Sequence, residues 1–326
     1  MDIPRTEKVN RWAHDYLVVD GVTVVTLDAE KYGLEYNRCS IFYLSILWLV
    51  SLWAMVTNMA QALFVKILKK RNKRLRHIIW EMGRDHKHIS SFAVDRFSRF
   101  NHRAKFGAAN WRALDLFYNY NEKVKPQING NLEGWLTQFW TGKMQNRQAV
   151  TNRLKIVIQL LTQAFSRFVN EPEVRLISVA SGSAQAVVEA MLQSSQNIKA
   201  ILIDVDSTAL EKAKEVAKGA GLENRFYFIR GSTKKLEKIC SEFKPHIIEM
   251  VGFLDYRPRN KAIELIGLIK KCLPDDGILL TCNIRRNIEK IFLDWVLLWP
   301  MHYRSEKQLV LLRQFMFYVI LNDRRK

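Results

Sequence analysis

The sequence has few cysteines and no pattern that would let them act together. Its 326 residues include Cys39, Cys240, Cys272 and Cys282, and no two of them have the spacing of a zinc knot or a disulfide framework. This argues against a small disulfide-built domain and favours a reducing compartment. The seven histidines are scattered as well, without a Cys or carboxylate pattern to complete a metal site. We therefore expect no bound metal.

Acidic residues are also scarce. Against 51 Lys and Arg there are 32 Asp and Glu, which gives a formal net charge of +19 at pH 7. The imbalance is concentrated in residues 66–105, with 13 basic and 3 acidic residues, whereas residues 1–38 hold 5 and 7. Such asymmetry predicts an anionic partner, either nucleic acid or an anionic lipid surface. The length allows a full core and more than one structural unit.

Charge is absent altogether between Cys39 and Val65. A bilayer span needs about 20 mostly apolar residues, so the run is long enough, and it begins too far from the N-terminus for a secretory signal peptide. Trp48 and Trp53 lie mid-run rather than at its ends, and no polar stripe is evident, so a buried or interfacial helix remains an alternative. We favour a transmembrane helix. The basic run Lys66–Arg76 then places the downstream domain in the cytoplasm.

These patterns divide the chain into four segments. A polar segment, residues 1–38, contains a strand-like run at 22–27. The predicted membrane helix occupies residues 39–66, and a basic, aromatic-rich helical region occupies residues 67–170. Aromatic side chains interleaved with Arg and Lys can stack on single-stranded nucleic acid, but they are more typical of helix packing. Residues 171–326 form the last segment.

Strand and helix patterns alternate in this last segment. We predict strands at 174–180, 200–205, 226–230, 246–251 and 277–283, and helices at 184–194, 207–219, 233–242, 259–273 and 285–298. Alternation at this spacing predicts an α/β fold, a Rossmann-like doubly wound parallel sheet with right-handed crossovers. Ligands of such sheets bind beyond the carboxyl ends of the strands.

The first two strand ends carry the pattern of a nucleotide site. The first strand runs into a turn of small residues, Ser178-Val-Ala-Ser-Gly-Ser-Ala184, followed by a helix whose free amides favour a carboxylate or phosphate. Asp204 ends the second strand, 22 positions after Gly182, where nucleotide folds place an acid on the ribose hydroxyls. Because only one glycine of the dinucleotide fingerprint is present, a dehydrogenase is disfavoured.

Two further strand ends complete the pattern. Arg230-Gly-Ser232 follows the third strand, and Glu249-Met-Val-Gly-Phe-Leu-Asp-Tyr256 ends the fourth. In this order the motifs resemble a class I S-adenosylmethionine-dependent methyltransferase, over about residues 140–315. The turn is also similar to the Ser-Ile-Ala-Cys-Gly-x-Ala form of a bacterial subgroup credited with making 3-hydroxypalmitic acid methyl ester. Asn283 and the pairing of Asp294-Trp295 with Tyr303-Arg304 resemble that subgroup too.

The resemblance implies S-adenosylmethionine as the cofactor. The cofactor-binding residues would then be Ala180, Gly182, Ala184, Asp204, Asp206, Gly231, Ser232, Val251 and Gly252. Two positions depart from the family pattern, because Ser178 replaces the acid of the first motif and Ser232 replaces the Asp near the adenine. The family also finishes with two antiparallel strands, whereas one is evident here, near Phe315–Leu321. These departures leave room for a descendant without activity.

The resemblance further implies methyl transfer to a small or lipid-like acceptor, near a membrane if residues 39–66 are membrane-bound. Arg304 would hold a carboxylate acceptor, aided by Asn283 or Tyr256, whereas a hydroxyl acceptor would need a base such as His302 or Glu249. We take Tyr256, Arg304 and His302 as the catalytic candidates. The alternatives are an inactive membrane scaffold with the same fold and an RNA methyltransferase. The latter is disfavoured because the fourth strand lacks an Asn/Asp-Pro-Pro-aromatic motif.

Overall fold

The chain folds into two units. The computed structural model describes residues 15–19, 22–28, 34–35, 39–68, 74–85, 87–284, 286–305, 308 and 316–322. An α/β unit comprises Met1–Leu34, Arg153–Arg286 and His302–Lys326, and a helical unit comprises Glu35–Asn152 and Asn287–Met301. Both units therefore combine stretches that are distant in the sequence, whereas the four predicted segments are each continuous.

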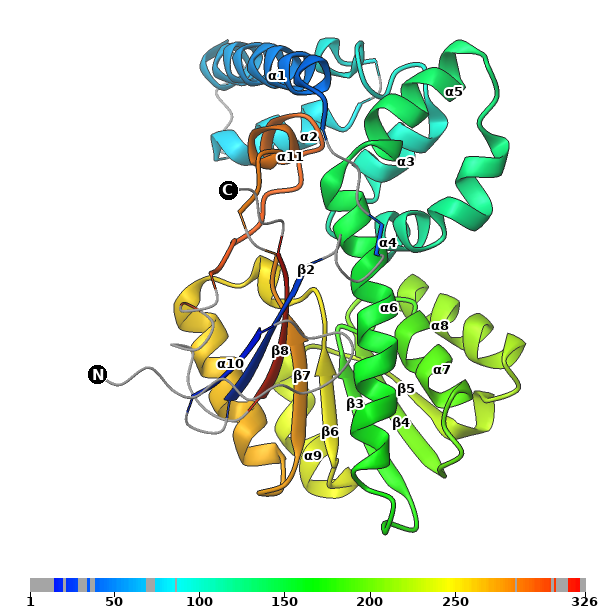
Figure 1. Cartoon of the computed structure of the whole chain (residues 1–326). Helices are drawn as coiled ribbons and strands as arrows, with labels where there is room; N and C mark the ends of the chain where they lie inside the picture. The colour runs from blue at the N-terminus through cyan, green and yellow to red at the C-terminus, as the bar shows by residue number, and fades with distance from the viewer. Residues whose placement is uncertain are drawn as a thin grey trace. The chain divides into compact units, whose positions relative to one another are not determined.

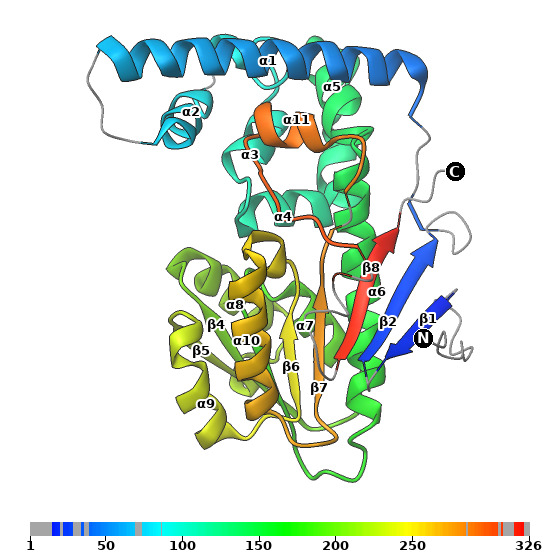
Figure 2. The same cartoon turned by 90° about the vertical axis from the view of Figure 1, so that its left-hand side faces the viewer.

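The α/β unit contains a sheet of eight described strands in the order β1-β2-β8-β7-β6-β3-β4-β5. They are β1 (Asp15–Val19), β2 (Val22–Asp28), β3 (Val174–Val179), β4 (Ile198–Asp204), β5 (Phe226–Arg230), β6 (Ile247–Met250), β7 (Ile278–Cys282) and β8 (Met316–Asn322). Strands β3 to β7 are all parallel, which confirms the predicted sheet. At the other edge β8 runs parallel to both β7 and β2, and β1 closes the edge antiparallel to β2 (Figure 2). The N-terminal segment thus supplies the edge that the C-terminal sequence leaves open.

Helices cover both faces of this sheet (Figure 1). The helices of this unit are α7 (Gln185–Leu192), α8 (Ser207–Gly219), α9 (Leu236–Phe243), α10 (Arg259–Cys272) and the part of α6 (Gln145–Ser166) from residue 153 onward. Short turns lie at η5 (Glu223–Arg225), η6 (Thr233–Lys235) and η7 (Leu254–Tyr256). Strand residues such as Ile177 and Ile248 pack against Leu236 and Ile266 of α9 and α10. Strands buried on both faces read as continuous apolar runs, which explains why the sequence predicts them well.

The helical unit is built from short helices and one long one. They are α1 (Ile41–Leu68), α2 (Leu75–Gly83), η1 (Ile89–Ser91), α3 (Arg99–Phe106), α4 (Trp111–Tyr118), η2 (Tyr120–Val124), η3 (Lys125–Gln127), α5 (Leu132–Thr137), η4 (Gln138–Gly142), the start of α6 and α11 (Lys290–Trp295). Side chains of Ser98, Asn110 and Asn131 cap α3, α4 and α5 by accepting backbone N–H groups. The helix predicted at 285–298 is shorter in the structure, where it corresponds to α11.

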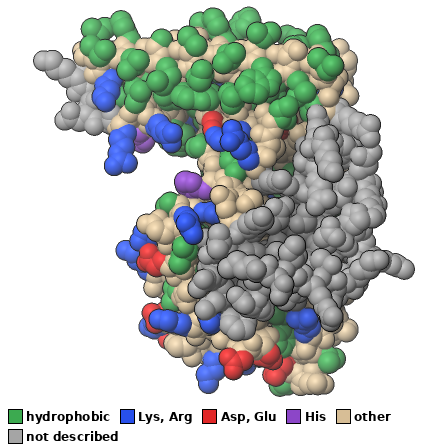
Figure 3. Space-filling model, turned by 60° about the vertical axis from the view of Figure 1, so that its left-hand side comes forward, with side chains coloured by type: hydrophobic (Ala, Val, Ile, Leu, Met, Phe, Trp, Pro, Cys, Tyr) green, Lys and Arg blue, Asp and Glu red, His purple; other side chains and the backbone are tan. Residues whose placement is uncertain are grey.

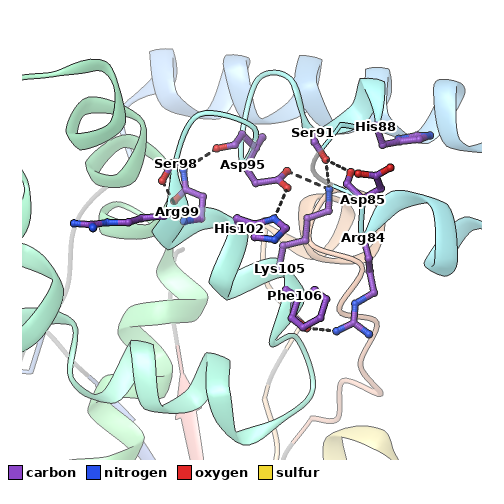
Figure 4. A network of polar contacts seen from close by, with 12 residues as sticks. Arg84, Asp85, His88, Ser91, Asp95, Ser98, Arg99, His102, Lys105 and Phe106 are labelled. Carbon is purple, nitrogen blue, oxygen red and sulfur yellow. Dashed lines mark hydrogen bonds and ion pairs between the residues drawn. The ribbon is translucent and has the colours of Figure 1, made fainter.

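A buried ion pair joins two of these helical elements (Figure 4). Lys105 is 1% exposed, and its Nζ donates to Asp95 Oδ1 at 3.1 Å and to Ser91 Oγ at 2.9 Å. His102 Nδ1 lies 3.5 Å from the second oxygen of the Asp95 carboxylate. Burial lowers the pKa of Lys105, and the nearby Asp95 opposes that shift. The pair fixes α3 against the segment around η1.

Helix α1 is long and apolar enough to span a membrane, judged by length and composition. Its packing within the helical unit is one-sided, because a single stripe is buried: Tyr43, Leu47, Ser51, Ala54, Asn58 and Ala62. Ala62 contacts Ile78 and Ile79 of α2 and Leu298 in one apolar cluster. The polar residues Ser51 and Asn58 lie on this inner stripe, so the outward face is the more apolar one.

Candidate functional site

The carboxyl ends of β3 and β6 mark the switch point of the sheet. β3 pairs with β4 on one side and with β6 on the other, so successive crossovers leave β3 in opposite directions. Ser178 and Glu249 are register partners across this junction. Open α/β sheets bind their ligands at such a point, where adjacent loops diverge.

The turn after β3 is held by the acid at the end of β4. Gly182 N donates to Asp204 Oδ2 at 3.0 Å, and Asp206 N donates to Asp204 Oδ1 at 2.9 Å. The structure therefore brings together the glycine and the acid that the sequence spacing pairs. Ala180, Gly182 and Ala184 have φ values of 54°, 56° and 53°. This left-handed conformation is unstrained at Gly182 but strained at Ala180 and Ala184, and strained backbone of this kind clusters at functional sites.

The turn after β3 has polar groups that can form further hydrogen bonds. Ser181 Oγ is buried and has no hydrogen-bond partner among the described residues. Ala184, directly before α7, offers no side chain to cap the helix. Asp204 is half-buried, and each of its carboxylate oxygens can accept more than the one backbone hydrogen bond it receives. The turn can therefore donate to and accept from a small polar ligand.

Three further predicted cofactor-binding residues, Gly231, Ser232 and Asp206, differ in what their atoms contact. Gly231 N donates to the Asp204 main-chain oxygen at 2.8 Å, which places the end of β5 beside the acid. Ser232 is exposed, and its Oγ accepts from Lys234 N at 3.4 Å. Asp206 caps α8, since its Oδ1 accepts from Thr208 N at 2.9 Å and from Thr208 Oγ1 at 2.7 Å. Asp206 and Ser232 thus both serve as helix caps.

A carboxylate that the first motif lacks is supplied by the neighbouring strand. Glu249 is buried, accepts a hydrogen bond from Ser178 Oγ, and accepts from Val251 N at 2.9 Å through its other oxygen. Burial raises the pKa of Glu249 to about 7, against the opposing effects of these hydrogen bonds and Arg153. The acid at the centre of the switch point therefore lies on β6 instead of β3.

The loop after β6 approaches a buried guanidinium. Gly252 has a φ of +80°, and a Cβ at this position would lie 3.2 Å from Arg153 Nη1. Arg153 Nη1 is 3.6 Å from Asp255 Oδ2 and 3.9 Å from Cys282 Sγ. Burial raises the pKa of Cys282 to about 11, which keeps its thiol protonated. Arg153 was not predicted, because the helical periodicity of this segment marks its apolar residues and gives no sign that a cation is buried among them.

Asp255 joins the loops that follow β6 and β7. It is 1% exposed, its Oδ1 accepts from Ile284 N at 2.8 Å, and its main-chain oxygen accepts from His302 N at 2.7 Å. Burial raises the pKa of Asp255, while Arg153 acts in the opposite direction. Tyr256 follows it in η7 and is half-buried. Asp255 therefore positions both Tyr256 and His302 beside the switch point.

Arg304 is used to hold the same loops. Its Nη1 donates to Leu254 O at 2.7 Å and to Asn283 Oδ1 at 2.5 Å, and its Nη2 donates to Arg257 O. Asn283 Nδ2 in turn donates to His302 O at 2.8 Å. The structure thus brings Tyr256, His302 and Arg304 together, with the His302 imidazole exposed and the Arg304 guanidinium engaged by the protein itself. Asp294 and Trp295 belong to α11 of the helical unit, so their predicted pairing with Tyr303 and Arg304 stays a prediction.

The fold is a doubly wound α/β domain, and the polar side chains described above lie at the switch point of its sheet. The family described as "Putative methyltransferase" matches residues 70–285, and the chain belongs to this family. The match confirms the predicted class of enzyme, a methyltransferase. The 3-hydroxypalmitic acid methyl ester subgroup remains a prediction. No curated protein matches the chain.

Solved structures resemble the chain at low sequence identity. A possible exported protein from Bordetella parapertussis is 14% identical, with 82% of this chain and 88% of that chain covered and a TM-score of 0.54. An S-adenosylmethionine-dependent methyltransferase from Geobacter sulfurreducens in complex with S-adenosyl-L-homocysteine is 18% identical, over 52% and 53%, with a TM-score of 0.32. An O-methyltransferase family protein from Burkholderia thailandensis is 13% identical, over 61% and 64%, with a TM-score of 0.41. The first structure shows a likeness of fold alone. The TM-scores of the other two are too low to support a conclusion about fold or function.

Proposed function

We propose that this chain transfers a methyl group from S-adenosylmethionine to an oxygen or nitrogen of a small or lipid-like acceptor. The observation that carries the proposal is the Asp204 carboxylate, bound to the Gly182 and Asp206 amides at the carboxyl end of β4. An acid in this place is suited to accept hydrogen bonds from both hydroxyls of a ribose. Membership of a methyltransferase family supports the choice of a methyl-donating nucleoside.

The residues present fit this cofactor. Asp204 would bind the ribose, and the buried, unpartnered Ser181 hydroxyl and the amides of the small-residue turn would meet the amino-acid end. Gly231, beside Asp204, would flank the adenine, and Val251 and Gly252 would border the methyl donor. When bound, the cofactor supplies an electrophilic methyl group on a sulfonium.

The chain's own residues would mainly orient the reactants and exclude water. Glu249 holds the loop at Val251, and Asp255 and Arg304 hold the segments that carry Tyr256 and His302. A carboxylate acceptor is already ionised and needs no base. For a hydroxyl acceptor the exposed imidazole of His302 is a better base than Glu249, whose two oxygens are hydrogen-bonded within the protein. A fatty-acid carboxylate or hydroxyl at a membrane, with the α/β unit in the cytoplasm, is the acceptor setting that we favour.

Calorimetric titration with S-adenosylmethionine and S-adenosyl-L-homocysteine tests the cofactor site. We expect Asp204→Ala to weaken binding by about 100-fold or more, because two charge-assisted contacts and the anchor of the turn are lost. Asp276→Ala, an exposed acid just before β7 at the amino end of the sheet, is the matched control and should bind normally. Asp206→Ala should lower the free energy of unfolding by about 1 kcal/mol, since it removes the α8 cap.

The outcomes separate the alternatives. Loss of binding in Asp204→Ala alone supports the site and justifies a screen of fatty acids, hydroxylated lipids and RNA as methyl acceptors with isotopically labelled cofactor. Failure of the unaltered chain to bind either nucleoside at millimolar concentration contradicts the proposal and leaves an inactive scaffold with a methyltransferase fold.

A further inference from the structure

Helix α1 presents an apolar face that no described residue covers. Six large side chains on this outer face are each 50–71% exposed: Phe42, Leu49, Trp53, Val56, Phe64 and Ile67. Their spacing of three, four, seven or eight residues puts them on one side of the helix. Figure 3 shows hydrophobic side chains gathered along α1, with Lys and Arg side chains beside them. An exposed patch of this length on a soluble surface marks an interaction site.

The opposite side of α1 is the polar one, and it is already engaged. Asn58 Nδ2 donates to Trp295 O at 3.0 Å, and Ser51 Oγ donates to Leu47 O at 2.6 Å. The Tyr43 hydroxyl lies 3.4 Å from Glu289 Oε1. Glu289 is fully buried and also accepts from the backbone amides at the start of α6. The Asn58 and Tyr43 contacts fix the inner stripe of α1 to α11 and, through Glu289, to the start of α6 within the helical unit, whereas the Ser51 bond satisfies its hydroxyl within α1.

A transmembrane orientation conflicts with this packing. Spanning would separate the inner stripe from its partners and expose Asn58 to hydrocarbon, where unsatisfied polar groups are strongly disfavoured. The positions of Trp48 and Trp53 also fit poorly, since a spanning helix carries its tryptophans at the two ends. In a helix lying parallel to the bilayer, every residue of the outer face lies at headgroup depth, where tryptophan is favoured.

The segment that follows α1 is strongly basic. The sequence from Lys66 to Arg76 contains seven Lys or Arg and no acid. The described members Lys66, Arg74 and Arg76 are exposed, and α2, which carries Arg76, packs against α1 through Ile78 and Ile79. Basic side chains next to an apolar face are attracted to anionic lipid headgroups.

We propose that α1 docks in the plane of an anionic membrane surface through this outer face and does not cross the bilayer. The inference develops the membrane setting of the proposed function and is independent of methyl transfer. It assigns the helix to monotopic attachment, in which the inner stripe stays folded onto the helical unit while the outer side chains enter the lipid interface.

Vesicle co-sedimentation of the purified full chain, without cofactor or acceptor, tests this docking. We expect binding to phosphatidylcholine vesicles that contain phosphatidylglycerol, weaker binding to phosphatidylcholine alone, and release by alkaline carbonate. Leu49→Glu should weaken binding by about tenfold or more, because it places a charge in the apolar face. Leu192→Glu is the matched control, since Leu192 is 57% exposed on α7 of the α/β unit, and it should bind like the unaltered chain. Asn58→Leu should leave vesicle binding unchanged, whereas it would strengthen a spanning helix.

Three results would overturn the inference. Resistance to carbonate extraction would show a spanning helix. Absence of vesicle binding together with a dimer that Leu49→Glu converts to a monomer would show that a second copy covers the face. A monomer that binds no vesicles would leave the face without a lipid partner. Because nucleoside binding is measured separately, none of these results would count against the methyltransferase site.

Discussion

Both units bury charged and polar side chains, but the two sets are arranged differently. In the α/β unit they lie at the carboxyl ends of β4 and β6, the two strands that flank β3, where the half-buried Asp204 and the buried Glu249 and Asp255 contact loops from several strands. In the helical unit each set closes on itself: Lys105 contacts Asp95 and Ser91, and the three guanidinium nitrogens of Arg147 contact Glu35, Thr141 O and Gly142 O. Convergence with remaining hydrogen-bonding capacity indicates a ligand site, whereas closed sets hold helices together.

Breaking a closed set should have the largest effect on stability. We expect Lys105→Met to lower the free energy of unfolding by about 3–5 kcal/mol, because the buried Asp95 carboxylate loses its ionic partner. Affinity for S-adenosylmethionine in the folded protein should change by less than about twofold, since the pair lies in the other unit. Urea unfolding and calorimetric binding measure the two quantities. Lys261→Met is the control, because Lys261 and Glu264 form an exposed pair worth less than about 1 kcal/mol. A comparable loss in cofactor affinity would show that the network serves the site.

Glu249 should make the stability of the α/β unit depend on pH. The folded state keeps its proton up to about pH 7. The unfolded chain loses that proton near pH 4, as an ordinary glutamate does. The folded state therefore binds the extra proton between these values, and the free energy of unfolding falls as the pH rises, by about 3 kcal/mol in all.

Glu249→Gln removes this dependence and makes the difference measurable. Relative to the unaltered chain, its unfolding free energy should depend less on pH between pH 5 and about pH 7, apart from a constant offset because one of the two acceptor oxygens becomes an NH2 group. Chemical unfolding at several pH values measures this, with the exposed Glu264→Gln as control. Parallel pH curves for Glu249→Gln and the unaltered chain would contradict a proton held at the switch point.

A comparison of Gly252 with Gly221 can separate the effects of backbone strain and of steric crowding on stability. Gly252→Ala and Gly221→Ala both introduce a side chain at positive φ, but Gly221 has no neighbour within 4 Å, whereas the new Cβ at 252 meets Arg153. We expect both variants to lose about 1 kcal/mol of stability, with up to about 2 kcal/mol more at 252. Only Gly252→Ala should also weaken cofactor binding. Equal losses in thermal unfolding and unchanged binding would remove the loop from the site.

The sequence predicted the parts of this arrangement that depend on local order. The strands of the sheet core are buried on both faces and read as apolar runs, and the spacing of Gly182 and Asp204 follows from one βαβ unit. The contact between Ser178 and Glu249 could not be predicted in this way, because it depends on the register between strands that are not consecutive. Arg153 was missed because helical periodicity marks an apolar face and does not mark a buried cation.

The long helix shows a different limit of sequence reasoning. Composition identifies an apolar helix of the length required for a span, but it does not tell which face is packed. Ser51 and Asn58 are seven residues apart and so share one side of the helix, and the structure shows that this side faces the protein. The preference for a transmembrane helix therefore rested on the length of the run and on its lack of charged side chains.

The pairing of β2 with β8 links the two ends of the α/β unit across almost the whole length of the chain. On a ribosome that adds about 5–20 residues per second, the β1–β2 hairpin emerges tens of seconds before its partner strand is made. An isolated hairpin is marginal in water, so this edge stays open to other strands until synthesis is nearly complete. Newly made chains should thus be most vulnerable to misassembly late in translation, and premature termination before residue 316 would leave the hairpin without its partner strand.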